Sequence, residues 1–127
     1  MDEEYGEAAV RHLTDADILA DGNRWGGAAY LVGFAAECAI KHRIETLRPQ
    51  QGVPHGHFPE ILDAARRHLG RRRDTALHTV LKMTNLMEGW SVLIRYSADA
   101  AVDQGLYTLW REHAVRLVWA AGLRRSS

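Results

Sequence analysis

Apolar residues recur at spacings of three and four along most of the chain, and few stretches alternate between apolar and polar at every second position. This pattern is typical of helices, and the scarcity of β-branched residues argues against strands. We expect five helical segments and an all-α fold, an antiparallel up-and-down bundle of four to five helices. Length priors for 127 residues favour a single domain, residues 1–127.

The first two helices are expected to form an antiparallel pair. The first covers about Glu4 to Ala20, and its apolar face comprises Ala9, Leu13, Ala16 and Ala20. The sequence Asp21-Gly22-Asn23 ends this helix, and we expect Gly22 to take the left-handed position at its C-terminus. The second helix follows from about Arg24 to Leu47, and so short a link predicts a helical hairpin.

The second helix contains the most informative stretch of the chain, GGAAYLVGFAAECAIKHRI from Gly26 to Ile44. It has no polar face before Lys41, and a helix that is apolar on all sides is expected at the centre of the fold. Its glycines Gly26, Gly27 and Gly33 each cost up to ~1 kcal/mol of helix propensity relative to alanine. We therefore expect them to permit close approach by a neighbouring element.

Glu37 is the single acid within this apolar stretch. A buried carboxyl group must find a partner or hold a proton. An arginine from another helix is the natural ion-pair candidate, and Arg95 is the residue we expect there. The alternative is that Glu37 points into a groove that water reaches.

Three further helices complete the expected bundle. The third begins near Pro59, which suits a first helical turn, and ends at Gly70. The fourth is expected from about Thr75 to Tyr96, with Gly89 as a position that breaks or bends it. The fifth is expected from about Gly105 to Leu123 and is closed by Gly122.

Composition narrows the class of protein. The 16 basic residues balance the 16 acidic ones, which argues against a generally basic nucleic-acid coat. The lone Cys38 excludes an internal disulfide and suits a reducing compartment. No apolar run reaches the length of a membrane span, and the acidic start lacks the positive region of a signal peptide. These features predict a cytoplasmic protein without membrane association.

A local basic cluster lies between the third and fourth expected helices. It comprises Arg66, Arg67, Arg71, Arg72 and Arg73, which face the single acid Asp74. Guanidinium groups pair with phosphate oxygens through two parallel hydrogen bonds, so the cluster is a candidate nucleotide-binding or nucleic-acid-binding site. The alternative is a solvated junction whose charge balances the acidic first helix.

The seven histidines raise the question of a metal. His55 and His57 could place two imidazoles on one ion, but zinc needs three or four ligands and Cys38 lies in the apolar helix. No Glu-x-x-His pair occurs, which excludes the di-iron bundle pattern. There is also no glycine-rich phosphate loop and no HExxH motif. We expect neither a metal nor another cofactor.

The order of several soft motifs resembles the HEPN superfamily over nearly the whole chain. These motifs are the small-apolar run that ends in Glu37-Cys38-Ala39-Ile40-Lys41, HFPEIL at His57 to Leu62, WSVLIRY at Trp90 to Tyr96, and the closing helix LYTLWREHAVRLVWAAGL. The resemblance implies an antiparallel bundle of four to five helices that pairs into a homodimer.

Many HEPN proteins are metal-independent ribonucleases whose motif is an arginine followed, after four to six residues, by a histidine. Arg95 matches the arginine by position, but Ala100, Ala101 and Val102 stand where the histidine is expected. Arg73 and His78 have the right spacing and lie earlier in the chain than the motif's usual place.

The missing histidine favours a non-catalytic role. The resemblance then implies a dimeric module that binds RNA or a nucleotide, or that partners a minimal nucleotidyltransferase, as in toxin–antitoxin or defence systems. The alternative is a metal-independent HEPN ribonuclease toxin that uses Arg73 and His78, or Arg95 with a histidine from elsewhere. A third hypothesis is a bundle with an assembly role only.

Overall fold

A computed structural model of the chain describes residues 4–47, 56–58, 60–69, 75–91 and 102–123. Within these ranges there are five α-helices and no strand, which confirms the all-α prediction. The helices are α1 (Tyr5–Asp21), α2 (Trp25–Leu47), α3 (Glu60–Leu69), α4 (Thr75–Leu81) and α5 (Gln104–Ala120). None of them combines the length and the apolar character that crossing a membrane requires.

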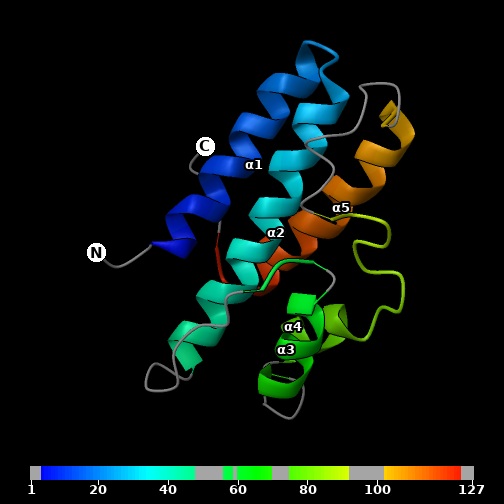
Figure 1. Ribbon diagram of the computed structural model, residues 1–127. Coiled ribbons are helices and arrows are strands. Elements are labelled where there is room, and N and C mark those ends of the chain that lie inside the picture. Colours follow the sequence, from blue (N-terminus) through cyan, green and yellow to red (C-terminus); the bar gives the residue numbers. More distant parts are fainter. Residues whose placement is uncertain (1–3, 48–55, 59, 70–74, 92–101, 124–127) are drawn as a thin grey trace.

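The three long helices lie side by side, and the two short helices cover one end of this layer (Figure 1). α1 and α2 run antiparallel, whereas α5 runs in the direction of α2. α2 contacts α1, α3 and α5, so it is the central helix, as its apolar sequence predicts. Its fully buried residues are Ala28, Ala29, Val32, Ala35, Ala36, Ala39 and Ile40. The predicted apolar face of α1 is likewise buried at Ala9, Leu13 and Ala16.

The turn between α1 and α2 differs from the expectation in one residue. Gly22 has φ −94°, and the left-handed conformation belongs to Asn23, with φ 61°. Asparagine tolerates this region better than most residues with a side chain. The backbone N–H of Asn23 donates to Ala20 O at 2.9 Å, and that of Arg24 donates to Leu19 O at 2.9 Å. The prediction that Gly22 takes this position was therefore wrong.

Gly33 makes room for the indole ring of Trp90. A Cβ atom at Gly33 would lie only 1.8 Å from Trp90 Cε2. Trp90 is 2% exposed, and its Nε1–H donates to the carbonyl oxygen of Ala29 at 2.8 Å. The expected close approach is thus made by a side chain from a segment 57 residues further along the chain.

The fourth helix is much shorter than predicted. α4 ends at Leu81, and the described residues that follow it form turns rather than helix. The backbone reverses at Met87 and Gly89, with φ 53° and 85°. Gly89 therefore lies in an irregular segment, and the predicted continuation of the helix through residues 82–91 is wrong. Tyr96, its expected end, lies outside the described residues.

Two contacts from other elements hold this irregular segment in place. The buried His113 of α5 accepts a hydrogen bond at Nδ1 from the backbone N–H of Met87, at 3.0 Å. Trp110 of α5 donates from Nε1 to the carbonyl oxygen of Glu88 at 2.9 Å. These partners satisfy two backbone groups of the irregular segment that a continuous helix would have satisfied internally.

The ends of α5 follow the expected signals. The Asp103 carboxylate accepts from the backbone N–H of Leu106 at 2.8 Å and so caps the N-terminus. Beyond Ala120, Gly122 adopts φ 83°, the left-handed conformation that glycine takes without strain. The side chains of Trp110 and Tyr107 are buried on this helix, whereas Trp119 is 65% exposed.

Candidate phosphate-binding pocket

A pocket of about 430 Å³ lies between α3 and α4. It is lined by Arg66 of α3, His78 and Leu81 of α4, and the following residues Lys82 and Thr84. Three of these five residues have basic side chains, and none is acidic. The pocket is therefore a concave site with cationic groups and a hydroxyl, a combination suited to an anion.

Arg66 is oriented by the end of α4. Its Nε–H donates to Leu81 O at 3.0 Å, and Nη2 donates to Met83 O at 3.2 Å. Leu81 is the last residue of α4, where the free carbonyl groups of a helix end favour a cation, and Met83 follows it in the turn segment. Two of the five guanidinium donors are used in this way. The opposite edge of the guanidinium plane keeps donors for another partner.

His78 and Lys82 are four residues apart, so a helical backbone places their side chains on one face. The backbone N–H of Lys82 still donates to His78 O at 3.1 Å, which extends that geometry one residue beyond Leu81. Arg66, a residue of the predicted basic cluster, and His78, the candidate catalytic histidine, thus line one pocket. Lys82 was missed by the sequence reasoning, although its spacing from His78 was a usable signal.

A second cavity, of about 590 Å³, adjoins the first and shares Arg66 and Thr84 with it. Its rim carries Glu60, Asp63 and Glu88. Glu60 and Asp63 lie in the first turn of α3, where a negative charge is stabilised by the helix dipole. The anion-attracting part is thus confined to the smaller pocket, because the carboxylates of the larger cavity repel a phosphate.

Glu37 holds the start of α3 against α2. It is 1% exposed, and its Oε1 accepts from the backbone N–H of Phe58 at 2.8 Å. Its Oε2 lies 3.0 Å from His57 Nδ1, on a side chain that is 46% exposed. An ionised carboxylate only accepts hydrogen bonds, so with Glu37 ionised the imidazole is the donor of this contact, through Nδ1–H. The predicted partner Arg95 lies outside the described residues.

The Glu37 contact also bears on the question of whether His57 could bind a metal ion together with His55. The imidazole nitrogen Nδ1 is engaged by a carboxylate and the ring meets Phe34 edge-on, with centroids 6.1 Å apart. Within the ranges that the structure covers, no three histidine, cysteine or acidic side chains come together as metal ligands. The other histidine of the suggested pair, His55, lies outside those ranges.

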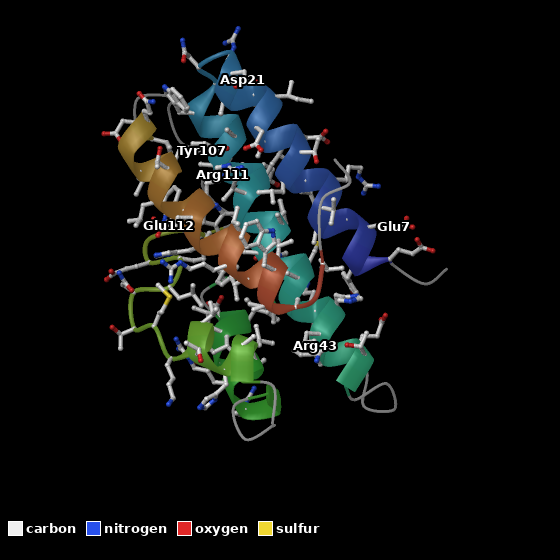
Figure 2. All side chains as sticks on the ribbon, turned by 180° about the vertical axis from the view of Figure 1, so that it is seen from behind. Glu7, Asp21, Arg43, Tyr107, Arg111 and Glu112 are labelled. Carbon is white, nitrogen blue, oxygen red and sulfur yellow. The ribbon has the colours of Figure 1, made fainter. Side chains whose placement is uncertain are left out.

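A second polar network joins α1 to α5. Arg111 donates from Nε to Asp17 Oδ1 at 2.6 Å and from Nη2 to Oδ2 at 3.0 Å. The hydroxyl of Tyr107 donates to the same carboxylate at 3.2 Å. Burial, assisted by the charge of Asp17, raises the pKa of Tyr107 to about 12. Figure 2 shows Tyr107 and Arg111 on neighbouring turns of α5.

The remaining predicted site residues divide into described and undescribed ones. Arg67 lies on α3 and is exposed, and Val102, at an expected histidine position, is buried and 3% exposed. Several others lie outside the described residues, namely Arg71, Arg72, Arg73, Arg95, Ala100 and Ala101. Of the two ribonuclease-motif candidates, the structure therefore places His78 in the pocket, whereas Arg73 and Arg95 lie outside the described residues.

Comparison of the chain with models of protein families, with curated proteins and with solved structures gives no match. The HEPN resemblance consequently rests on the sequence motifs alone. The described residues share with the expectation from this resemblance only the all-helical class and the number of helices.

Proposed function

We propose that this chain is a HEPN-like helical domain that acts as a homodimer and binds a phosphate-bearing ligand, a nucleotide or RNA, without cleaving it. The observation that carries this proposal is the pocket in which Arg66, His78 and Lys82 converge. The neighbouring cluster Arg71 to Arg73 adds positive charge close by in sequence. A role beside a minimal nucleotidyltransferase is a prediction of the resemblance alone.

The pocket favours a phosphate over other anions for a geometric reason. The Arg66 guanidinium is already fixed by two carbonyl groups, so little side-chain entropy is lost when its other edge binds. His78 of α4 and Lys82, which directly follows α4, line the same pocket and supply two further donors. Several converging donors match the several acceptor oxygens of a phosphate better than the two of a carboxylate.

Binding is tested with a fluorescently labelled single-stranded RNA and, separately, with ATP. We expect Lys82→Ala to weaken RNA binding about three- to tenfold and to reduce the log–log salt slope by roughly 0.7, the value for one lost contact to a single strand. The matched control is Lys41→Ala, which removes the same charge from α2, where Lys41 lies over the Tyr5 ring at 5.7 Å. Equal binding by Lys82→Ala and the wild-type protein would contradict the pocket.

Two further variants locate the site. We expect His78→Ala to weaken binding as Lys82→Ala does, because both residues line the same pocket. Replacing Arg71, Arg72 and Arg73 together with alanine should lower both the affinity and the salt slope if the adjoining cluster extends the site. Full affinity in that triple variant would restrict the site to the pocket.

The alternative function is a metal-independent ribonuclease, and the observation that favours it is the presence of His78 beside Arg66 in the pocket. An acid–base histidine contributes about 10²- to 10⁴-fold to such a reaction. We expect no RNA cleavage above background when the pure protein is incubated with RNA and a chelator. Cleavage that disappears in His78→Ala would replace the binding proposal with the enzymatic one.

A further inference from the structure

One face of α5 carries large apolar side chains that no described residue covers. Leu109 is 43% exposed and Trp119 is 65% exposed. Between them lie Glu112 and Arg116, both exposed, whose side chains form an ion pair at 3.0 Å along the helix. We name Leu109, Glu112, Arg116 and Trp119 the α5 stripe. Ala114, on the opposite side of the helix, is fully buried.

The α5 stripe is continuous and narrow. Its residues follow one another at intervals of three, four and three. At about 100° per residue they lie within roughly 80° of one another on the helix surface. Figure 2 shows Glu112 on the side of α5 that is turned away from α1. A stripe of this spacing is the kind of surface along which a second helix packs.

The α5 stripe is also self-complementary. Leu109 and Trp119 are each five residues from Ala114, and Glu112 and Arg116 are each two residues from it. If a second α5 is laid antiparallel across the stripe, Leu109 comes to the height of Trp119 of the second copy. Glu112 comes to the height of Arg116 of the second copy. A two-fold axis therefore matches apolar with apolar and acid with base.

We propose that the α5 stripe is the surface through which two copies of this chain associate, with their α5 helices antiparallel. The inference rests on the homodimer in the proposed function and adds the surface and the symmetry. Trp119 and Leu109 are the apolar anchors at the two ends of the contact, since tryptophan is enriched among residues that dominate interface energies. The exposed Gly105 lies in line with the stripe one turn before Leu109, and the exposed Thr108 lies beside it.

Charge reversal tests this pairing against every other mode of association. Glu112→Arg places two arginines at each charged contact of the symmetric pair, and Arg116→Glu places two acids there. Each variant should weaken self-association about tenfold or more, because like charges face each other twice. An equimolar mixture of the two variants should restore dimer formation, because each contact in the mixed dimer then joins an arginine to a glutamate. The loss of the intrahelical pair costs only a few tenths of a kcal/mol, so both variants should stay folded.

Sedimentation of the full chain across micromolar concentrations gives the readout, with circular dichroism to confirm folding. Trp119→Ser should also weaken the dimer, whereas Ile18→Ser should not. Ile18 is the matched control, because it is 64% exposed and lies on α1, away from the stripe. We expect a two-chain mass for the mixture of Glu112→Arg and Arg116→Glu, and a weakened dimer for each of these variants alone.

Two outcomes would overturn the proposal, and they differ in what they leave standing. A wild-type dimer that none of the α5 variants weakens would refute this surface and keep the homodimer. A wild-type monomer at high micromolar concentration would refute both. Neither outcome affects phosphate binding, which the pocket variants measure independently.

Discussion

At the residue scale, the buried Glu37 shows how one polar side chain joins α2 to the residues that precede α3. Both carboxylate oxygens are used, one by the backbone N–H of Phe58 and one by His57. The sequence predicts that such a residue needs a partner, because an unpaired buried carboxyl group is costly. It does not reveal that these partners lie only 20 and 21 residues further on, because a loop residue and a backbone N–H carry no pattern of their own.

We expect Glu37→Ala to lower the free energy of unfolding by about 2–4 kcal/mol, because it leaves the buried Phe58 N–H without an acceptor and opens a cavity. Glu37→Gln keeps the shape and one acceptor, so its cost should be smaller. Urea unfolding measures both. The control is Glu45→Gln on the same helix, an exposed carboxylate whose loss should change stability by less than about 0.5 kcal/mol. Equal effects at positions 37 and 45 would show that the Glu37 contacts contribute nothing.

At the scale of elements, α1, α2, α3 and α5 follow the periodicity of the sequence, and their bounds lie close to the predicted ones. The failure is α4, whose end depends on residues far away in the chain. Arg66, 15 residues before Leu81, donates a hydrogen bond to the carbonyl oxygen of Leu81. His113, 26 residues after Met87, accepts a hydrogen bond from the backbone N–H of Met87. Tertiary contacts of this kind override helix propensity and leave no local signal.

Contacts between residues far apart in the chain also limit how much of the candidate pocket can be predicted from the sequence. Arg66 and His78 fall in one basic stretch, so composition brings them to attention together. Their convergence in a pocket with Lys82 requires α3 and α4 to fold back on each other after a specific length. Charge clustering indicates an anion site, but the cavity itself depends on where α4 ends.

The packing of Trp90 on α2 gives a test at this scale. We expect Gly33→Ala to destabilise the protein by about 1–3 kcal/mol or more, because a Cβ there would collide with the indole ring. Gly27→Ala is the matched control on the same helix, where the nearest atom is the flexible Leu19 Cδ1 at 3.3 Å. There the gain in helix propensity of up to ~1 kcal/mol should dominate or cancel the cost. Two equal destabilisations in thermal unfolding would contradict the close approach of Trp90.

At the scale of the whole molecule, burial disfavours the charged form of several histidines. Burial lowers the pKa of His12, His42 and His113 below the ordinary value. His12 Nδ1 is buried and has no hydrogen-bond partner among the described residues, and His113 Nδ1 accepts from Met87. Protonation of His113 Nδ1 would abolish that acceptor. These groups lie on α1, α2 and α5, so they couple the stability of all three long helices to pH.

A lowered histidine pKa in the folded state means that the unfolded chain binds more protons below about pH 6.5. The stabilisation is therefore complete above that pH and is lost as the pH falls through the folded-state values. Each histidine contributes at most about 1.4 kcal/mol per pH unit. Urea unfolding at pH 7.5, 6.5 and 5.5 should show stability falling with pH, mainly between the last two values.

The variant His113→Asn isolates one contribution to this pH dependence. The asparagine side-chain oxygen can replace Nδ1 as the acceptor for Met87 and does not titrate. We expect a shallower fall in stability between pH 6.5 and 5.5 than in the wild-type protein, with little change at pH 7.5. A wild-type stability that stays constant across this range would contradict the neutral, buried state of the three histidines. A slope unchanged by His113→Asn would instead assign the pH dependence to His12 and His42.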